Sequence, residues 1–368
     1  MKSGTSRRRF AVALAAIGLA IAGCGKVEKE AGTQAAKAAQ SAPISIGWSV
    51  YAGYMPLPYA QQAGIVERWN KKYGVNIRMV QVNDYVESLN QFTAGKLQGV
   101  ATTTFDALTL PAAGGRDTSF LVIGDYSNGN DGIVLKDGKT LADIKGRPVN
   151  LPQYSVSHYM LARALEKAGL SLSDVSIVNT SDADLVSAFA TPQTVAVAAW
   201  NPMLDATAAM PGASLVFSSR EIPGELVDGI VVDTALVRDN PNAAKALVGI
   251  WYETMSVIRA GGSRADEALG QMGRLSGTDL AGFRSQISRA YLYSDPAEAA
   301  AFMEGPDMVA GMDRVRRFAF AQGLFGQGAR SVDEIGIALP GGKVLGDPAN
   351  VKLRIDPTFA RAAARGEL

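Results

Sequence analysis

The residues that could form a binding site follow the expected β-strands of this chain. In open α/β sheets, ligands bind beyond the carboxyl ends of the strands, so the residues after each β-rich run are the candidates. Acids, amides, hydroxyls and aromatic rings dominate these positions, and Lys and Arg do not occur among them. The candidates are Trp48, Tyr51, Tyr54, Phe105, Asp106, Asn128, Asn130, Asp131, Ser155, Ser157, His158, Ser181, Asp182, Trp200, Asn201, Glu225 and Asp228.

This set of side chains favours a planar cation as the ligand. Carboxylates accept hydrogen bonds from N–H groups, and the face of a Trp ring attracts a cation. A sulfonate or nitrate would be a poorer ligand, because it would lie beside the acidic residues Asp106 and Asp131. Helix N-termini alone can nevertheless form an anion pocket. Three charge-assisted hydrogen bonds of roughly 1.5–3 kcal/mol each, with one cation–π contact, would reach the ~8 kcal/mol of micromolar binding.

Several candidates also have a purely structural interpretation. Asp106, Ser181 and Asp182 could each cap a helix, and a cap at Asp106 would still face the cleft. Trp48 and Tyr51 could pack in a core. We favour ligand contact for these two aromatic residues, because a Trp in a loop at a strand end usually lies at a cleft.

Four further candidates are weighed in the same way. His158 lies on an amphipathic helix, and we favour a structural role for it over a ligand contact. Asp131 and Asp228 could fix turns at a hinge, which is the interpretation we favour for Asp228. Glu225 follows Pro223-Gly224 and is kept as a candidate ligand contact.

The composition restricts the class of protein. The chain has 368 residues, 47% hydrophobic and 19% charged, which is typical of a globular protein and long enough for two lobes. Four of the 36 basic residues lie in residues 1–23, so the rest of the chain carries 32 basic and 35 acidic residues and is a poor partner for nucleic acid. One Cys and one His exclude intramolecular disulfides, Cys-rich zinc sites and His-cluster metal sites. We expect a monomer without a cofactor.

The N-terminus has the pattern of an export signal. Residues 1–23 combine a basic start with an apolar run too short to span a bilayer. Ile21-Ala22-Gly23-Cys24 resembles a lipobox, which predicts lipid attachment at Cys24; a plain secretory signal is the alternative. Ser6-Arg7-Arg8-Arg9-Phe10 leaves both the Sec and the twin-arginine routes open. Residues 24–42 read as a flexible tether, so we expect a protein anchored by lipid in the periplasm or on the outer face of the cytoplasmic membrane.

From residue 43 onward, short β-rich runs alternate with helical stretches, which predicts an α/β fold. The expected strands are 44–48, 76–82, 100–104, 121–124, 148–151, 175–179, 195–199 and 214–217. The expected helices are 57–73, 85–94, helices starting near 106, 157, 181 and 201, and a C-terminal set at 241–259, 265–275, 279–291 and 306–322.

A short internal repeat brackets the middle of the chain. Asp131-Gly132-Ile133-Val134 precedes the middle block, and Asp228-Gly229-Ile230-Val231 follows it. Two matching extended segments are what a two-strand hinge would need. We therefore expect two lobes with two parallel-rich mixed sheets: residues 43–133 begin lobe 1, residues 134–231 form lobe 2, and residues 232–368 return to lobe 1 as helices.

Several segments together resemble the substrate-binding proteins of ABC importers. These segments are Gly47–Tyr54, Gly124–Val134, Ser155–Tyr159, Asn179–Asp184, Ala199–Pro202 and Ala338–Asp347. The resemblance covers residues 43–368 and is to the nitrate/taurine/sulfonate/thiamine-precursor branch, more specifically to the binding proteins encoded beside urea carboxylase. It implies a two-lobed periplasmic binding protein of type II. It also implies a urea- or guanidine-like solute and a membrane permease with a separate ATPase subunit.

The resemblance implies hinge closure around the solute rather than catalysis. The ligand would stack on Trp48 and Tyr51 and bond to Asp106, and lobe 2 would complete the site with residues such as Ser155, Ser181 and Trp200. A taurine-, sulfonate- or nitrate-type anion is the alternative ligand. A pyrimidine-precursor synthase, the related enzyme, needs a Cys-rich iron site that a chain with only Cys24 does not offer, and no Gly-x-Ser-x-Gly elbow marks a hydrolase.

Overall fold

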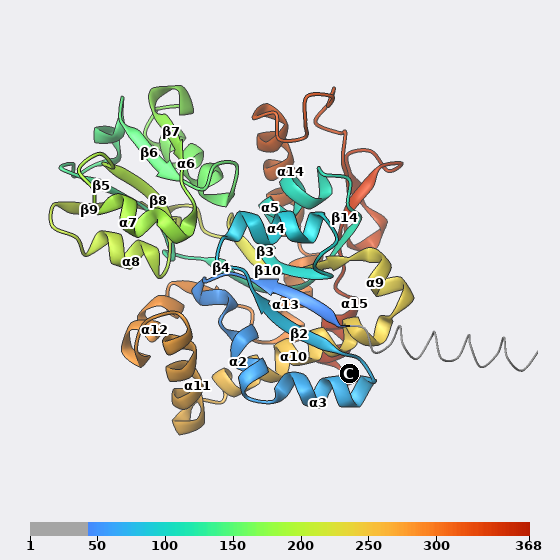
Figure 1. Ribbon diagram of the computed structural model, residues 1–368. Coiled ribbons are helices and arrows are strands. Elements are labelled where there is room, and N and C mark those ends of the chain that lie inside the picture. The colour runs from blue at the N-terminus through green and yellow to red at the C-terminus, as the bar shows by residue number, and fades with distance from the viewer. Residues whose placement is uncertain (1–42) are drawn as a thin grey trace, which may run out of the picture. The chain divides into compact units, whose positions relative to one another are not determined.

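The computed structural model describes residues 43–368, which form one compact unit (Figure 1). The predicted export signal, the lipid site at Cys24 and the tether lie outside the described residues. Within residues 43–368, no helix has both the length and the apolar character that crossing a membrane requires.

The first sheet is mixed and contains the strands from both ends of the described chain. Strands β1, β2 and β3 pair in parallel, as do β4, β14 and β12, and β10 joins the two groups by running antiparallel to both β3 and β4. In spatial order the strands are β13 (Val344–Leu345), β12 (Gly336–Ala338), β14 (Val351–Ile355), β4 (Thr118–Ser127), β10 (Val227–Asp233), β3 (Gly99–Thr103), β1 (Ile44–Trp48) and β2 (Ile77–Gln81), with β11 (Ala290–Leu292) also paired to β4.

The second sheet is smaller and is built from the middle of the chain. Its order is β7 (Ser176–Asn179), β6 (Pro148–Leu151), β8 (Ala196–Trp200), β5 (Asp131–Lys136) and β9 (Ala213–Ser218). Strands β6, β7 and β8 are parallel, whereas β5 runs antiparallel to β8 and β9. The expected α/β architecture with two mixed sheets is therefore confirmed.

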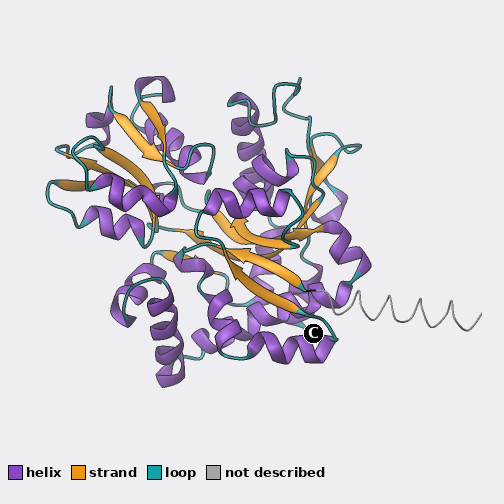
Figure 2. Cartoon of the chain, viewed as in Figure 1, coloured by secondary structure: helices purple, strands orange, loops and turns teal. Residues whose placement is uncertain are grey.

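Helices flank both sheets (Figure 2). Figure 1 shows α6, α7 and α8 grouped with the second sheet, while the C-terminal helices surround the first. The helices are α2 (Pro56–Gln62), α3 (Ile65–Tyr73), α4 (Tyr85–Thr93), α5 (Thr104–Ala107), α6 (Val156–Lys167), α7 (Leu185–Phe189), α8 (Met203–Ala208), α9 (Thr234–Asp239), α10 (Pro241–Arg259), α11 (Gly262–Leu275), α12 (Leu280–Ile287), α13 (Pro296–Glu304), α14 (Pro306–Ala321) and α15 (Thr358–Ala364).

Two sequence expectations differ from the observed elements. The expected helix 57–73 is broken at Gly64, whose φ of 68° lies in the left-handed region that glycine adopts without strain. The C-terminal part is not purely helical, because β11, β12, β13 and β14 extend the first sheet. The expected helix 279–291 ends at Ile287, and Tyr291 instead pairs with Tyr126 of β4, where the two rings stack at 4.9 Å.

The chain passes twice between the sheets, between β4 and β5 and again between β9 and β10. The repeated Asp-Gly-Ile-Val segments lie just after these two passages, one at the start of β5 and the other in β10. Both strands run antiparallel to their neighbours. The hinge role and the lobe boundaries remain predictions.

Candidate ligand-binding site

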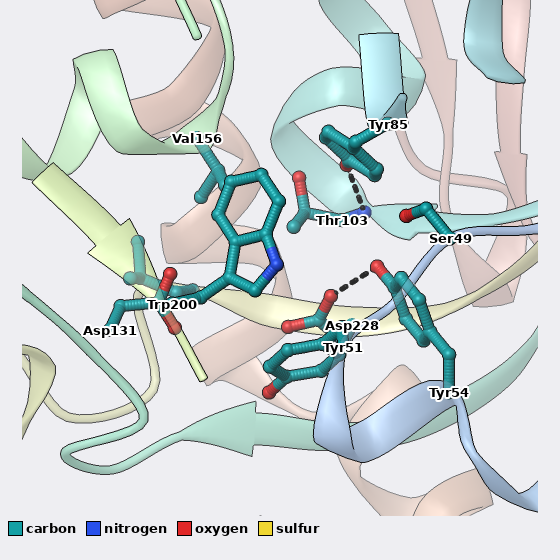
Figure 3. Close-up of a pocket in the computed structure, with 10 residues that line it drawn as sticks. Ser49, Tyr51, Tyr54, Tyr85, Thr103, Asp131, Val156, Trp200 and Asp228 are labelled. Atoms are coloured by element: carbon teal, nitrogen blue, oxygen red, sulfur yellow. Dashed lines mark hydrogen bonds between the residues drawn. The ribbon is translucent and has the colours of Figure 1, made fainter. Parts of the chain in front are cut away.

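A small cavity is lined by residues from both parts of the chain, the part that forms the first sheet and the part that forms the second (Figure 3). The centre of a water molecule can occupy about 20 Å³ of it. Three lining residues, Asp131, Val156 and Trp200, come from the second sheet and its helix α6. The others are Ser49, Tyr51, Tyr54, Tyr85, Thr103, Leu226 and Asp228.

The internal repeat places one aspartate from each sheet at this cavity. Because β10 and β5 are antiparallel to their neighbours, their first residues meet the carboxyl ends of β3 and β8: Asp228 is opposite Thr103, and Asp131 is opposite Trp200. The glycine after each aspartate is required by close backbone contact. A Cβ at position 229 would lie 1.8 Å from the carbonyl oxygen of Val122, and one at position 132 would lie 2.8 Å from that of Phe217.

Two further buried aspartates lie directly behind the cavity wall. Asp125 of β4 accepts a hydrogen bond from the Tyr51 hydroxyl at 2.8 Å, just as Asp228 accepts one from Tyr54 at 2.5 Å. Asp106 of α5 accepts from the Tyr85 hydroxyl at 2.7 Å and from the Thr103 hydroxyl at 2.8 Å. The carboxylates of Asp106, Asp125 and Asp228 therefore each accept a hydrogen bond from the hydroxyl of a tyrosine that lines the cavity.

Several buried polar atoms near the cavity have no hydrogen-bond partner. Asp106 Oδ1 and Asp125 Oδ2 are unpaired acceptors, and Ser49 Oγ is also unpaired. A buried polar group without a partner costs free energy, so such atoms mark places where a ligand or water would bind. None of the ten lining residues is Lys or Arg. Within residues 43–368, no cluster of three His, Cys, Asp or Glu side chains could hold a metal ion.

Burial shifts the acid–base behaviour of all four aspartates. It raises the pKa of Asp106 to about 6 and the pKa values of Asp125 and Asp131 to about 7. Burial, together with the charges of Asp125 and Asp131, also raises the pKa of Asp228 well above its usual range. The cause is the same in each case: a charge removed from water, with no basic residue lining the cavity to compensate it.

Hydrogen bonds across the cleft hold the two halves of the site together. Trp200 Nε1 donates to the carbonyl oxygen of Val50 at 3.1 Å. Asp182 accepts from the backbone N–H of Tyr85 at 2.9 Å, and the Ser181 hydroxyl donates to the carboxylate of Asp84. Ser181 and Asp182 thus lie at the rim of the cleft rather than in the cavity wall.

Of the candidates from the sequence, Tyr51, Tyr54, Asp131, Trp200 and Asp228 line the cavity, and Asp106 lies directly behind it. The others pack elsewhere. Trp48 is buried in the core of the first sheet, and Phe105 stacks on Tyr159 at 5.3 Å. Among the remaining predictions, Asn130 and Asn201 hydrogen-bond to each other, Ser155 caps α6, Ser157 is buried with an unpaired hydroxyl, and His158 accepts from the backbone N–H of Tyr154.

Glu225 does not line the cavity. Its carboxylate is bound instead by one tyrosine and two arginines. It accepts from the Tyr159 hydroxyl at 2.6 Å and from Arg163 Nε at 2.9 Å, and Arg314 lies at 3.4 Å. Burial alone would raise the pKa of Glu225, but the hydrogen bonds from Arg163 and Tyr159 more than offset this and hold it below its usual range. A carboxylate with three such neighbours has little left to offer a cationic ligand.

Two residues of the site are absent from the candidates drawn from the sequence, and a third, Asp228, is ranked low among them. Tyr85 follows β2 and could have been found by the strand-end rule that selected the other candidates. Asp125 was hidden because β4 continues to Ser127, beyond its expected end at residue 124. Asp228 was interpreted as a hinge turn, since the sequence does not reveal that β10 runs antiparallel to β3.

Comparison with solved structures defines the fold as that of periplasmic binding proteins. The alkanesulfonate-binding protein SsuA of Xanthomonas axonopodis pv. citri, solved with bound MOPS, superposes with a TM-score of 0.65 and 19% identity over 78% of this chain and 95% of that one. The periplasmic nitrate-binding protein NrtA of Synechocystis PCC 6803 gives a TM-score of 0.55 and 12% identity over 89% and 99% of the two chains.

Sequence comparison identifies the family. Residues 37–269 match the NMT1-like family, and the chain belongs to that family. A Brucella abortus relative named as a binding protein is 29% identical over 151 residues, which is 40% of this chain and 46% of the relative. The chain thus spans about half the length of that relative.

Proposed function

We propose that this protein is an extracytoplasmic solute-binding protein that delivers a small, planar, nitrogenous cation of the guanidinium type to an ABC importer. The observation that carries the proposal is the set of four buried aspartates around one cavity lined by no Lys or Arg. An unpaired buried carboxylate costs several kcal/mol, and a ligand that carries positive charge and several N–H groups would offset that cost.

The arrangement of the cavity also supports a flat, N–H-rich ligand. Tyr51, Tyr54, Tyr85 and Trp200 supply aromatic faces, on which a planar cation can stack. The carboxylates of Asp131 and Asp228, which line the cavity, accept hydrogen bonds but donate none when ionised. A quaternary ammonium ion would use the rings and leave these acceptors unpaired, whereas guanidinium satisfies both.

The alternative ligand is an anion, as the names of the sulfonate- and nitrate-binding structural neighbours suggest. An anion in this cavity would face Asp131 and Asp228, with Asp106 and Asp125 close behind them. Like charges at such distances repel strongly in a buried site, so the anion would bind only with these groups protonated. Neutral urea is a further candidate, since it has guanidinium's shape without its charge.

The proposed mechanism is hinge closure. Residues 43–133 and 232–368 would form one lobe and residues 134–231 the other, with the hinge at the two passages between the sheets. Ligand bound on the first lobe would be enclosed by Asp131, Val156 and Trp200 of the second. The closed form would be recognised by a permease with a separate ATPase subunit, while a lipid on Cys24 would hold the protein at the membrane.

Calorimetric titration of the purified protein with guanidinium, urea, taurine and nitrate tests the proposal. We expect guanidinium to bind and taurine and nitrate not to bind. Asp131→Asn should weaken guanidinium binding by roughly 2–4 kcal/mol, because it breaks a buried pair of charges. The same change should scarcely affect urea, since Asn keeps a carbonyl acceptor in nearly the same place.

Asp239→Asn is the matched control, because Asp239 is an exposed aspartate paired with Arg238. It ends α9, which follows the end of β10 that is farther from Asp228. It should leave every affinity unchanged. Taurine or nitrate binding that persists in Asp131→Asn, without a guanidinium signal, would refute the cation proposal and support the anion alternative.

A further inference from the structure

Trp200 closes the cavity from the side of the second sheet. Figure 3 shows its indole projecting into the group of lining side chains. The side chain is only 4% exposed, although it ends a strand at the rim of the cleft. Two contacts fix the ring: its Nε1 donates to the Val50 carbonyl oxygen at 3.1 Å, and it meets the Tyr85 ring edge-to-face at 5.4 Å.

Both contacts join the two halves of the site. Val50 and Tyr85 belong to the part of the chain that forms the first sheet, and Trp200 ends β8 of the second. Under the proposed hinge closure, the indole reaches its observed position only when the cleft is closed. A ligand too large for the space beneath the ring would break both contacts at once.

The space beneath the ring is small. A water molecule needs roughly 10–15 Å³ for its centre, so the 20 Å³ available here is on the scale of one or two waters. The bare guanidinium ion, a carbon with its three nitrogens in one plane, is of this scale. An alkyl chain on one nitrogen would need additional room.

The other walls are less able to yield. Tyr51 and Tyr54 are anchored by hydrogen bonds to Asp125 and Asp228 within the first sheet. At Asp131 and Asp228, an alkyl chain would cover carboxylates and leave them without N–H partners. Compared with these four residues, Trp200 is the one whose displacement would let the closed site accept a longer ligand.

We propose that Trp200 sets the upper size limit of the site and restricts it to guanidinium itself, excluding N-alkylguanidines. This inference rests on the function proposed above and deepens it by naming the residue that determines specificity. Trp200 acts here as part of the binding wall, through its volume, in addition to any attraction between its ring and the cation.

Titration of the full-length protein with guanidinium and with N-butylguanidinium tests the inference. We expect the wild type to bind guanidinium at least 100-fold more tightly than N-butylguanidinium. Trp200→Ala should weaken guanidinium about tenfold, through the lost ring contact, and strengthen N-butylguanidinium about tenfold, through the new space. The ratio of the two affinities should therefore fall about 100-fold.

Two further variants separate volume from fold. Trp200→Phe keeps an aromatic face but is smaller and lacks Nε1, so its ratio of the two affinities should lie between those of the wild type and Trp200→Ala. If the alanine variant folds poorly, a ratio for Trp200→Phe below that of the wild type still tests the size limit. Tyr291→Ala removes an exposed ring that does not line the cavity and should leave the ratio unchanged.

Each outcome is decisive. Equal wild-type binding of both cations would overturn the size limit and leave the cation-binding function intact. Trp200→Ala and Trp200→Phe variants that weaken both ligands by the same factor would show that Trp200 is only a contact, which also overturns the inference. A wild type that binds neither cation would refute the proposed function, and the inference with it.

Discussion

At the scale of single residues, the site depends on carboxylates that the fold keeps away from compensating charge. Asp106 shows how: three donors, the Tyr85 and Thr103 hydroxyls and the backbone N–H of Val156, converge on its Oδ2, while Oδ1 is buried without a partner. These donors lower its pKa, but burial outweighs them. Ionising these carboxyl groups in the empty cavity is therefore costly, and the proposed cation would offset that cost.

The raised pKa values give a pH dependence with a definite sign. In the unfolded chain an aspartate titrates near pH ~4. Burial raises the pKa values of Asp125 and Asp131 to about 7. Between the unfolded and the folded pKa values, the folded protein therefore binds more protons than the unfolded chain. The free protein should therefore lose stability as the pH rises from about 4 to about 7. The melting temperature without ligand, measured across this range, should fall.

Cation binding should show the opposite trend. Deprotonated aspartates attract guanidinium and protonated ones do not, so its affinity should be higher at pH 8 than at pH 5, with protons released on binding at the lower pH. Calorimetry in two buffers of different ionisation enthalpy measures that release. An affinity for guanidinium that is independent of pH would contradict the assignment of these carboxylates to the ligand. Urea serves as the uncharged control, and its affinity should not rise with pH.

At the scale of elements, the sequence predicts the strands and extended segments as far as β10, but not β11, β12, β13 and β14, which the C-terminal part adds to the first sheet. Strand β1 is predicted with its observed bounds, Ile44–Trp48, because large apolar residues at 44, 46 and 48 alternate with Ser45 and Gly47. Strands β12 and β13 have three and two residues, too few for a period-2 pattern. β12 and β13 pair with each other, and β12 also pairs with β14. They join the first sheet only because β14 pairs with β4, which is distant in sequence.

The same limit applies to the candidate site. The strand-end rule found Tyr51, Tyr54, Asp131 and Trp200 because it requires only that strands be recognised. It could not rank Asp228 above Trp48. That ranking depends on the direction of β10, which is set by pairing with β3 and β4 and not by local sequence.

Glu225 connects elements that belong to different halves of the fold. Its carboxylate binds Tyr159 and Arg163 of α6, beside the second sheet, and Arg314 of α14. The side chain of Glu225 is 10% exposed, so these bonds are shielded from water. We infer that this network stabilises the closed arrangement without touching the ligand.

Replacing Arg163 tests that inference. Arg163→Met keeps most of the aliphatic stem but removes both hydrogen bonds to Glu225, and should lower the free energy of unfolding by roughly 1.5–3 kcal/mol in urea denaturation. Arg238→Met, at an exposed pair with Asp239, should change it by less than about 1 kcal/mol.

Ligand affinity gives a second readout of the same variant. Arg163→Met should weaken guanidinium and N-butylguanidinium by the same factor, because it changes only the population of the closed form. A change in the ratio of the two affinities would place Arg163 in the binding wall instead of the closure network.

At the scale of the whole molecule, several bonds join the part of the chain that forms the first sheet to the part that forms the second. The Trp200–Val50 and Asp182–Tyr85 hydrogen bonds are two of them. A third is the ion pair at 2.5 Å between Arg289, which precedes β11, and Asp205 of α8. Each contact is modest by itself. If the proposed hinge closure operates, a ligand that favours the closed form would need to add only a few kcal/mol to shift the protein from an open to a closed form.

Hinge closure therefore predicts a change in size that small-angle scattering can measure. On addition of saturating guanidinium, the radius of gyration of the protein should decrease, because the second lobe swings toward the first about the two passages between the sheets. Asp131→Asn at the same guanidinium concentration is the control: with its weakened binding, it should stay at the radius of the free protein. An unchanged radius in wild-type protein that calorimetry shows to be saturated would exclude closure as the response to ligand. The cavity would then have to fill through a fixed entrance, and Trp200, whose two anchoring contacts both cross the cleft, would be the first residue required to move.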